Sequence, residues 1–266
     1  MKDYIRENKK AWEEAFEHSS IEYKNRTLDL LKHDPRSLFT KSMIRLLDNP
    51  YYKGKVLGQF CSNNGRETLG SLVFGFQETI GFDLAKNMVE YANDLASKLD
   101  LNARFVETNI LNIDSSYQDM FDVGMLTVGA IPWFQDLDEL FKSIHKTLKI
   151  GADIIIEDIH PVANMLAAKG EPNYDAKYPQ LIVNDYFKKT PWVEVEGMGY
   201  MTGNTYQSKT FTSYAHPMMD IINGLVMNGF EILYIEENNV DQSNMFDEVN
   251  ESIIPLTFII HAKKVR

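Results

Sequence analysis

The chain lacks several features that would point to other classes of protein. It has one cysteine, Cys61, and so cannot form an internal disulfide, which favours a reducing, cytoplasmic setting. No run approaches about 18 apolar residues, so no membrane-spanning helix is expected, and the charged opening MKDYIRENKK leads into no apolar stretch that would indicate a secretion signal. Basic residues are also scarce: 27 Lys and Arg stand against 38 Asp and Glu. The net charge of −11 disfavours nucleic acid as a partner.

The 266 residues are 44% hydrophobic and 24% charged, a composition that suits one α/β domain with an insertion as well as two domains.

The first fifty residues are expected to form helices. Ile5, Trp12 and Phe16 fall on one helical face. A second helix should stop before Asp34-Pro35, and a third, which carries Leu38, Met43 and Leu46, should end at Asn49-Pro50. Residues 1–50 are therefore expected to form an N-terminal helical cap.

After residue 51, short apolar segments alternate with amphipathic helices. Strands are expected at 56–60, 79–83, 103–107, 121–127 and around 154–156. This alternation predicts right-handed crossovers and a parallel sheet covered on both faces. Two last strands, at 230–235 and 256–262, are joined by a polar segment alone and should be antiparallel to each other. The predicted fold is α/β, a doubly wound and mostly parallel sheet of about seven strands.

The section from residue 160 to residue 216 breaks this rhythm. It is rich in Tyr, Pro, Gly and Asn, and no strong period runs through it. We expect a main domain over residues 51–266 with a substrate lid inserted at about 161–216. Its aromatic residues, Tyr178 among them, could enclose an apolar or cationic molecule, or could form a small satellite core.

The exit of the first strand is the expected ligand site, because ligands of such sheets bind where the strand order reverses. The polar loop from Cys61 to Gly65 leads into a helix N-terminus, whose free N–H groups favour an anion. A plain strand-to-helix turn is the alternative. Asp83 ends the second strand, where a carboxylate can accept hydrogen bonds from ribose hydroxyls, or can cap the next helix. Together the loop and the acid indicate a nucleoside-containing cofactor.

The loop does not carry the G-x-G-x-x-G fingerprint of dinucleotide-binding proteins. Cys61 and Asn63 stand where glycines would make room for a pyrophosphate, which argues against NAD or FAD. A cofactor without phosphates, such as S-adenosylmethionine, makes less demand on this loop.

These motifs, taken in order, resemble the class I S-adenosylmethionine-dependent methyltransferases. More narrowly, the chain looks like a bacterial small-molecule subgroup with a glycine-poor first motif. The family pattern D/E-x-G-x-G-x-G aligns without gaps, with Gln59 at the acid position and Cys61, Asn63 and Gly65 at the glycine positions. Further colinear motifs are Asn8-x-x-x-Trp12 with His18, Gly81-Phe82-Asp83, Thr108-Asn109-Ile110, Leu148-Lys149-Ile150-Gly151-Ala152, Asp158-Ile159-His160-Pro161, and Asp220 through Phe230. The likeness covers nearly the whole chain apart from roughly 165–205.

The resemblance implies S-adenosylmethionine as the cofactor, a small molecule as the methyl acceptor, and a monomer or homodimer with no membrane partner. The residues it assigns to the cofactor are Trp12, Gln59, Cys61, Asn63, Gly65, Asp83, Leu84, Asn109, Ile110, Val128 and Gly129. Trp12 could instead simply anchor the cap helix. His216 and Tyr178 are expected on the substrate side.

His160, after the fifth strand, is the best candidate for a general base, because its ordinary pKa suits proton transfer near neutrality. Asp158 is a candidate to orient it, and a structural histidine bonded to a backbone carbonyl is the alternative. No metal site is expected, since the histidines are scattered and no metal-binding motif occurs. Two other functions stay open: a non-catalytic binding protein on a decayed version of the fold, and, disfavoured by the loop, a nucleotide-dependent oxidoreductase.

Overall fold

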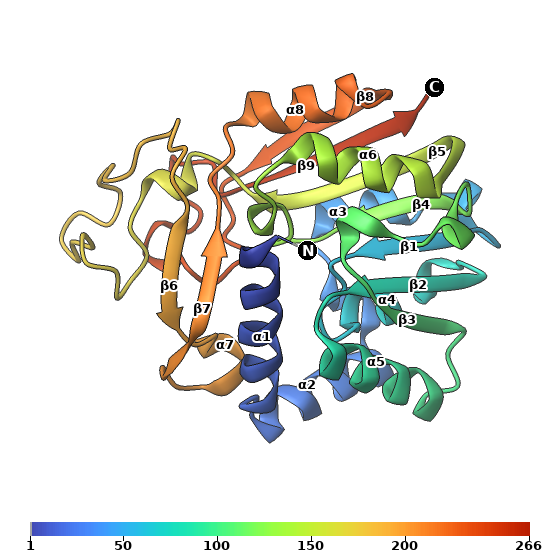
Figure 1. The fold of residues 1–266 in the computed structure, drawn as a ribbon, viewed down its shortest axis with the longest axis horizontal. Helices are drawn as coiled ribbons and strands as arrows, with labels where there is room; N and C mark the ends of the chain where they lie inside the picture. Colours follow the sequence, from blue (N-terminus) through green and yellow to red (C-terminus); the bar gives the residue numbers. More distant parts are fainter. Residues whose placement is uncertain (1) are drawn as a thin grey trace.

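A seven-stranded sheet forms the centre of the computed structural model, which describes residues 2–266 (Figure 1). Its strands are β1 (Val56–Phe60), β2 (Glu78–Asp83), β3 (Ala103–Glu107), β4 (Phe121–Leu126), β5 (Leu148–Ile159), β8 (Phe230–Asn238) and β9 (Thr257–Lys264). They lie in the order β3-β2-β1-β4-β5-β9-β8, and the first five are parallel. β9 is antiparallel to both β5 and β8. The predicted fold class and the antiparallel pairing of the last two strands are confirmed.

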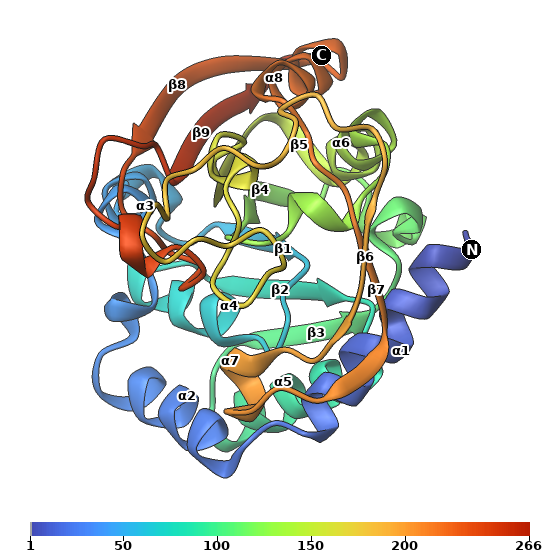
Figure 2. The ribbon, with the colours of Figure 1, turned by 90° about the vertical axis from the view of Figure 1, so that its left-hand side faces the viewer.

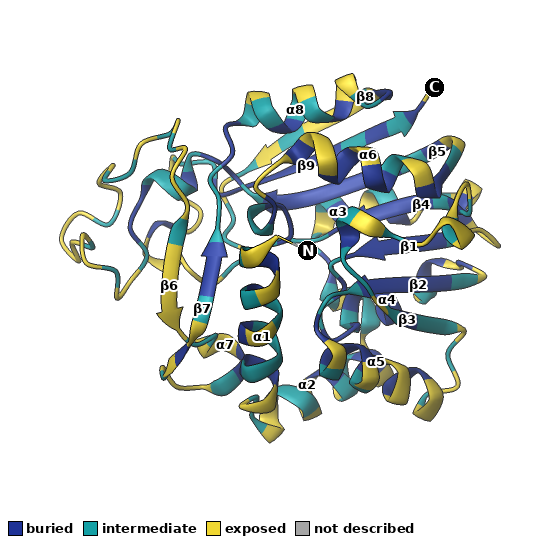
Figure 3. Ribbon diagram, viewed as in Figure 1, coloured by how far each residue is buried: buried dark blue, intermediate teal, exposed yellow. Residues whose placement is uncertain are grey.

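Helices cover both faces of the sheet. α6 (Leu137–Thr147) and α8 (Met218–Met227) pack on one face, where Leu140 and Phe141 share a buried cluster with Leu225. α3 (Lys41–Leu47), α4 (Arg66–Gly70) and α5 (Lys86–Lys98) lie on the other face. The central strands are therefore buried on both sides (Figure 3), as a parallel sheet of this kind requires.

The N-terminal segment forms two longer helices before α3. α1 (Asp3–Glu17) stands across the end of the sheet to which the parallel strands point, and α2 (Ile21–His33) follows it (Figure 1). α2 ends before Asp34-Pro35, as the proline predicts. The third expected helix begins later than predicted, because Leu38 lies in a separate 3-10 turn and the Thr40 hydroxyl accepts the Met43 N–H as the N-cap of α3.

Residues 160–216, which show no clear hydrophobic periodicity, contain a two-stranded antiparallel sheet. β6 (Trp192–Glu196) and β7 (Gln207–Ser213) pair with each other, and the short helix α7 (Gly199–Thr202) joins them. Figure 2 shows this hairpin beside α1, in front of the sheet edge. β7 is half covered whereas β6 is exposed (Figure 3).

A buried asparagine links this hairpin to α1. The Asn8 amide donates to the Thr212 carbonyl at 2.8 Å, and its carbonyl oxygen accepts the Thr212 N–H at 2.7 Å. The side chain thus pairs with β7 as a neighbouring strand would. Within residues 2–266, no helix combines the length and apolar composition needed to cross a bilayer.

Candidate functional site

The loop that leaves β1 lies where the strand order reverses, between β1 and β4. Cys61, Asn63 and Gly65 all have positive φ angles, of 60°, 51° and 83°. Non-glycine residues rarely adopt this left-handed conformation, although asparagine does so more readily than most. The loop therefore keeps a glycine-type backbone at the three positions that align with the family glycines, even though two of those glycines are replaced.

A glycine is required at position 65 because there is no room for a side chain, as well as because φ is positive. A Cβ atom at this position would lie 2.6 Å from the Phe105 ring and 2.7 Å from the Ala92 Cβ atom. Its N–H donates to the Ser62 carbonyl at 2.9 Å, which closes the loop just before α4 begins. The last glycine of the motif thus lets the loop pack directly onto α5 and β3.

Asp83 ends β2 immediately beside this loop. Its Oδ2 accepts the Asn63 N–H at 2.7 Å, and its Oδ1 accepts the Ala85 N–H at 3.0 Å. Burial raises the pKa of Asp83 to about 6, and the backbone amides of Ala85 and Asn63 partly oppose that rise. The N-cap of α5 is Ala85, so Asp83 is not the helix cap.

Gln59, at the acid position of the first motif, is fully buried. Its Oε1 accepts the Thr68 hydroxyl at 2.6 Å, and its Nε2 donates to the Thr127 hydroxyl at 3.0 Å. Both ends of the amide are therefore used within the protein, where they connect β1 to α4 and to the end of β4. A neutral amide makes both bonds without burying a charge.

The other expected cofactor residues follow neighbouring strands. Leu84 comes directly after β2, and Asn109 and Ile110 follow β3, where the Asn109 side chain accepts the Leu111 N–H at 3.1 Å. Val128 and Gly129 follow β4. Because the carboxyl ends of parallel strands meet at one edge, all these residues lie at the same edge as the β1 loop.

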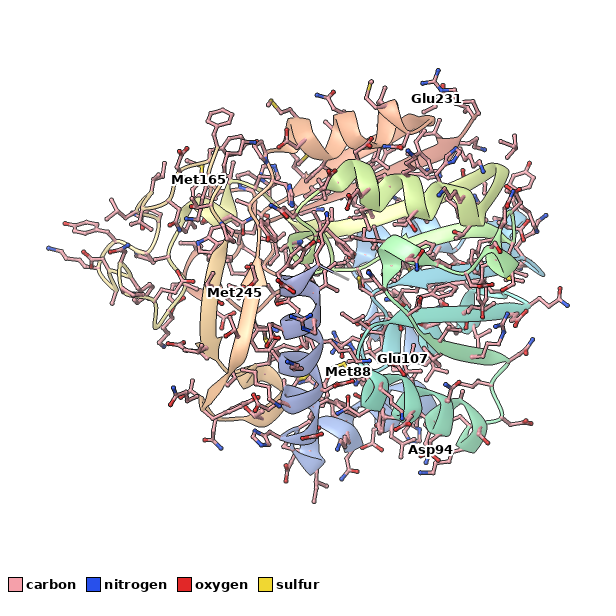
Figure 4. All side chains as sticks on the ribbon, viewed as in Figure 1. Met88, Asp94, Glu107, Met165, Glu231 and Met245 are labelled. Atoms are coloured by element: carbon pink, nitrogen blue, oxygen red, sulfur yellow. The ribbon has the colours of Figure 1, made fainter. Side chains whose placement is uncertain are left out.

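Trp12 faces this edge from α1 through an aromatic cluster. Its ring makes edge contacts with Trp133, at 5.1 Å between centroids, and with Phe211, at 5.4 Å. Met88, which Figure 4 labels at the start of α5, belongs to the same cluster. Lys9 of α1 pairs with Glu107 at the end of β3, so α1 contacts the sheet edge by both packing and charge.

Tyr200 is a site residue that sequence reasoning places only in an aromatic-rich segment, with no role of its own. Its hydroxyl accepts the Asn63 side-chain amide at 3.4 Å, and its ring makes an edge contact with Tyr23. The insertion therefore touches the β1 loop through α7. Tyr200 and Asn63 are 137 residues apart, and no sequence pattern connects them.

A family model described as a methyltransferase domain matches residues 61–204, which is more than half of the chain. The chain belongs to this methyltransferase family. No curated protein sequence matches it.

Solved methyltransferases share the fold. A Listeria monocytogenes protein, described as a candidate S-adenosylmethionine-dependent methyltransferase, is 20% identical with a TM-score of 0.61, over 83% of this chain and 97% of that one. An S-adenosylmethionine-dependent methyltransferase from Mesorhizobium loti is 17% identical with a TM-score of 0.59, over 88% and 99% of the two chains. The geranyl diphosphate C-methyltransferase of Streptomyces coelicolor, solved with S-adenosyl-L-homocysteine, is 13% identical with a TM-score of 0.55, over 84% and 78%.

His160 of the methyltransferase domain has partners on both ring nitrogens. Its Nε2 lies 2.7 Å from a carboxylate oxygen of Glu237 on β8, and its Nδ1 accepts the Val162 N–H at 3.1 Å. Burial lowers the pKa of His160, while Glu237 acts in the opposite direction. Partners on both nitrogens favour a structural role over the general base, although these partners are a carboxylate and a backbone N–H and not the expected backbone carbonyl.

The pairing of Asp158 with His160 is wrong. The Asp158 carboxylate accepts the backbone N–H groups of Gly129, Ile131 and Ile159 and makes no hydrogen bond to His160. Residues two apart share a face only while a strand continues, but β5 ends at Ile159, before His160, and both Asp158 oxygens accept backbone N–H groups of the loop after β4.

The two expected substrate-side residues lie in different surroundings. His216 is buried, its Nε2 lies 2.7 Å from the Phe134 carbonyl oxygen, and burial lowers its pKa. Tyr178 is half exposed, and its ring contacts the Lys177 ammonium. Across residues 2–266, no three His, Cys, Asp or Glu side chains converge in a way that could hold a metal ion.

Proposed function

We propose that this methyltransferase domain binds S-adenosylmethionine at the β1 exit loop and transfers its methyl group to a small molecule. The observation that carries this function is the positive φ of Cys61, Asn63 and Gly65, the three positions of the family's glycine motif. Two non-glycine residues keep a conformation that costs each of them about 1–2 kcal/mol, with Asn63 at the lower end. Strained backbone conformations of this kind cluster at ligand-binding and active sites, which supports a ligand-binding role for the loop.

The residues present fit an adenosyl compound. Each oxygen of Asp83 has lone pairs beyond the N–H it accepts, so the carboxylate can also accept ribose hydroxyls. We assign the adenine to Asn109 and Ile110, and the methionine end to Val128 and Gly129. Trp12, in its aromatic cluster, would cover the ligand from α1.

The sulfonium of the cofactor supplies an activated methyl group and a neutral leaving group. The protein then has to align the acceptor and keep water out. α1 and the insertion at 161–216 are placed to do this, because Asn8 joins them and Tyr200 reaches the loop. We assign no general base, since both nitrogens of His160 are bonded within the protein. His216 and Tyr178 stay predictions as substrate-side residues.

Calorimetric titration with S-adenosylhomocysteine tests the cofactor assignment. We expect micromolar binding to the wild type and none to NAD. The comparison variant is Gly65→Val. Its side chain would enter the space occupied by Phe105 and Ala92, and the folded variant should not bind the ligand. A folded wild-type protein that binds no adenosyl ligand would overturn the function.

Catalysis is separated from binding alone by incubation with S-adenosylmethionine and a metabolite extract. Release of S-adenosylhomocysteine that depends on the extract supports transfer to a small molecule. Tight binding without release from any extract would favour the non-catalytic alternative.

A further inference from the structure

Asp158 is a buried carboxylate that the proposed chemistry does not use. It lies near the carboxyl end of β5 and is 1% exposed. Its Oδ1 accepts the N–H groups of Gly129 at 2.7 Å and Ile159 at 2.8 Å, and its Oδ2 accepts that of Ile131 at 2.8 Å. Burial raises the pKa of Asp158 to about 6, against the lowering effect of these amides. The groups that compensate for its burial are thus mainly backbone N–H groups.

Two of these amides belong to the segment 129–134, which follows β4. The other side of this segment contacts the cap and the insertion. Trp133 packs against Trp12 of α1 and Phe211 of β7. The Pro132 carbonyl accepts the Tyr214 N–H at 2.8 Å. The segment therefore connects the sheet to both elements that stand before its edge.

We propose that Asp158 is a positioning residue for the cofactor site. By holding the amides of Gly129 and Ile131 it fixes the backbone of segment 129–134, and through Trp133 it sets where α1 and β7 lie over the ligand. This assignment rests on the proposed function, since segment 129–134 begins with Gly129, which is assigned to the methionine end.

The physical basis lies in the charge and the acceptor geometry of the side chain. A carboxylate offers acceptors on both oxygens, and hydrogen bonds to a charged group are roughly twice as strong as neutral ones. An asparagine of the same shape accepts on one side only. Its NH₂ group would face either the Ile131 N–H or the N–H groups of Gly129 and Ile159, so at least one amide loses its partner while the packing volume is nearly unchanged.

The test compares Asp158→Asn with Asp153→Asn. Asp153 is a matched control because it is a mostly buried carboxylate on the same strand, but its partners are the side chains of Tyr52, His261 and Lys263. We expect folded Asp158→Asn to bind S-adenosylhomocysteine about ten- to a hundred-fold more weakly, as for one lost charge-assisted bond. Its near-ultraviolet circular dichroism should also change, because Trp12 and Trp133 are in contact. Asp153→Asn should lower the melting temperature but keep the affinity within about two-fold.

Four results would contradict the positioning role or the function on which it rests. Wild-type affinity and an unchanged tryptophan signal in Asp158→Asn would overturn the positioning role, as would an equal loss of affinity in Asp153→Asn. If the wild type binds no adenosyl ligand, the proposed function fails, and amide exchange measured by NMR then tests Asp158 independently. The role requires slow exchange at Gly129 and Ile131 in the wild type, and rapid exchange there contradicts it. The same exchange measurement serves if Asp158→Asn does not fold.

Discussion

The backbone N–H of Asn63 donates to Asp83 Oδ2 at 2.7 Å, which ties the β1 exit loop to the end of β2. A left-handed non-glycine residue costs about 1–2 kcal/mol, and a hydrogen bond to a charged group contributes about 1.5–3 kcal/mol. The carboxylate can therefore offset the strain at Asn63. This relationship explains how a methyltransferase loop keeps its shape after losing two glycines.

Asp83→Asn should weaken S-adenosylhomocysteine binding by about 1.5–3 kcal/mol, because hydrogen bonds from the ribose to a charged acceptor are lost. Calorimetry on the folded variant measures this change. The exposed Asp94→Asn on α5 is the control and should bind as the wild type does. An unchanged affinity in Asp83→Asn would refute the ribose assignment.

Binding should also depend on pH. The pKa of Asp83 is raised to about 6, and ribose hydroxyls donate to the ionised form, so ligand binding favours deprotonation. Affinity should be constant above pH 7 and fall as the pH drops through 6. Asp158 has a pKa raised to about 6 as well, so Asp83→Asn should lose part of this dependence and not all of it. A flat profile from pH 7.5 to 5 in the wild type would contradict the assignment.

Substitutions at Cys61 and Gly65 should differ in their effect on stability. Cys61→Gly relieves a φ of 60° and should leave unfolding free energy within about 1 kcal/mol of the wild type, since relief of strain opposes the extra freedom of glycine. Gly65→Ala should cost more than about 2 kcal/mol, because the new Cβ meets Phe105 and Ala92 below 3 Å. Urea unfolding measures both, and a stable Gly65→Ala protein would show that the loop is not held as described.

His160→Ala should lower stability by about 1–3 kcal/mol and leave S-adenosylhomocysteine affinity unchanged. The variant removes the partner of the Val162 N–H and the contact with Glu237. Thermal unfolding and calorimetry on one preparation separate the two quantities. Wild-type stability combined with lost turnover, once an acceptor is known, would restore the general base.

Asn8→Ala should loosen the cap from the insertion. Both polar groups of this buried side chain are bonded to Thr212, so the variant leaves a backbone N–H and a carbonyl unpaired, at about 1–3 kcal/mol. Hydrogen exchange should rise in α1 and in 207–213. The exposed Asn25→Ala on α2 serves as the control, and equal exchange in both variants would show that Asn8 does not join the two elements.

The sheet could be predicted because its signals are local. β1 and β3 have the expected bounds, since short apolar runs between polar turns indicate buried strands. The positions of Cys61, Asn63 and Gly65 in the loop followed from a gap-free alignment, and their φ angles agree with it.

The parts that the sequence did not predict depend on distant partners. The partner of His160 is Glu237, 77 residues away, and the partner of Asn8 is Thr212, 204 residues away. β6 alternates polar and apolar residues, yet its apolar residues Val193 and Val195 are exposed. The alternation therefore does not correspond to a buried face, which is the usual basis for predicting a strand. The β6–β7 hairpin packs on α1 through β7, and no hydrophobic periodicity within residues 160–216 predicts that contact.

A crystal structure of the protein grown with S-adenosylhomocysteine tests the central claim most directly. We expect the ligand along the loop Cys61–Gly65, with the ribose hydroxyls on the Asp83 carboxylate and the methionine end beside Gly129. A loop that changes to negative φ at Cys61 and Asn63, or a ligand bound away from Asp83, would contradict it.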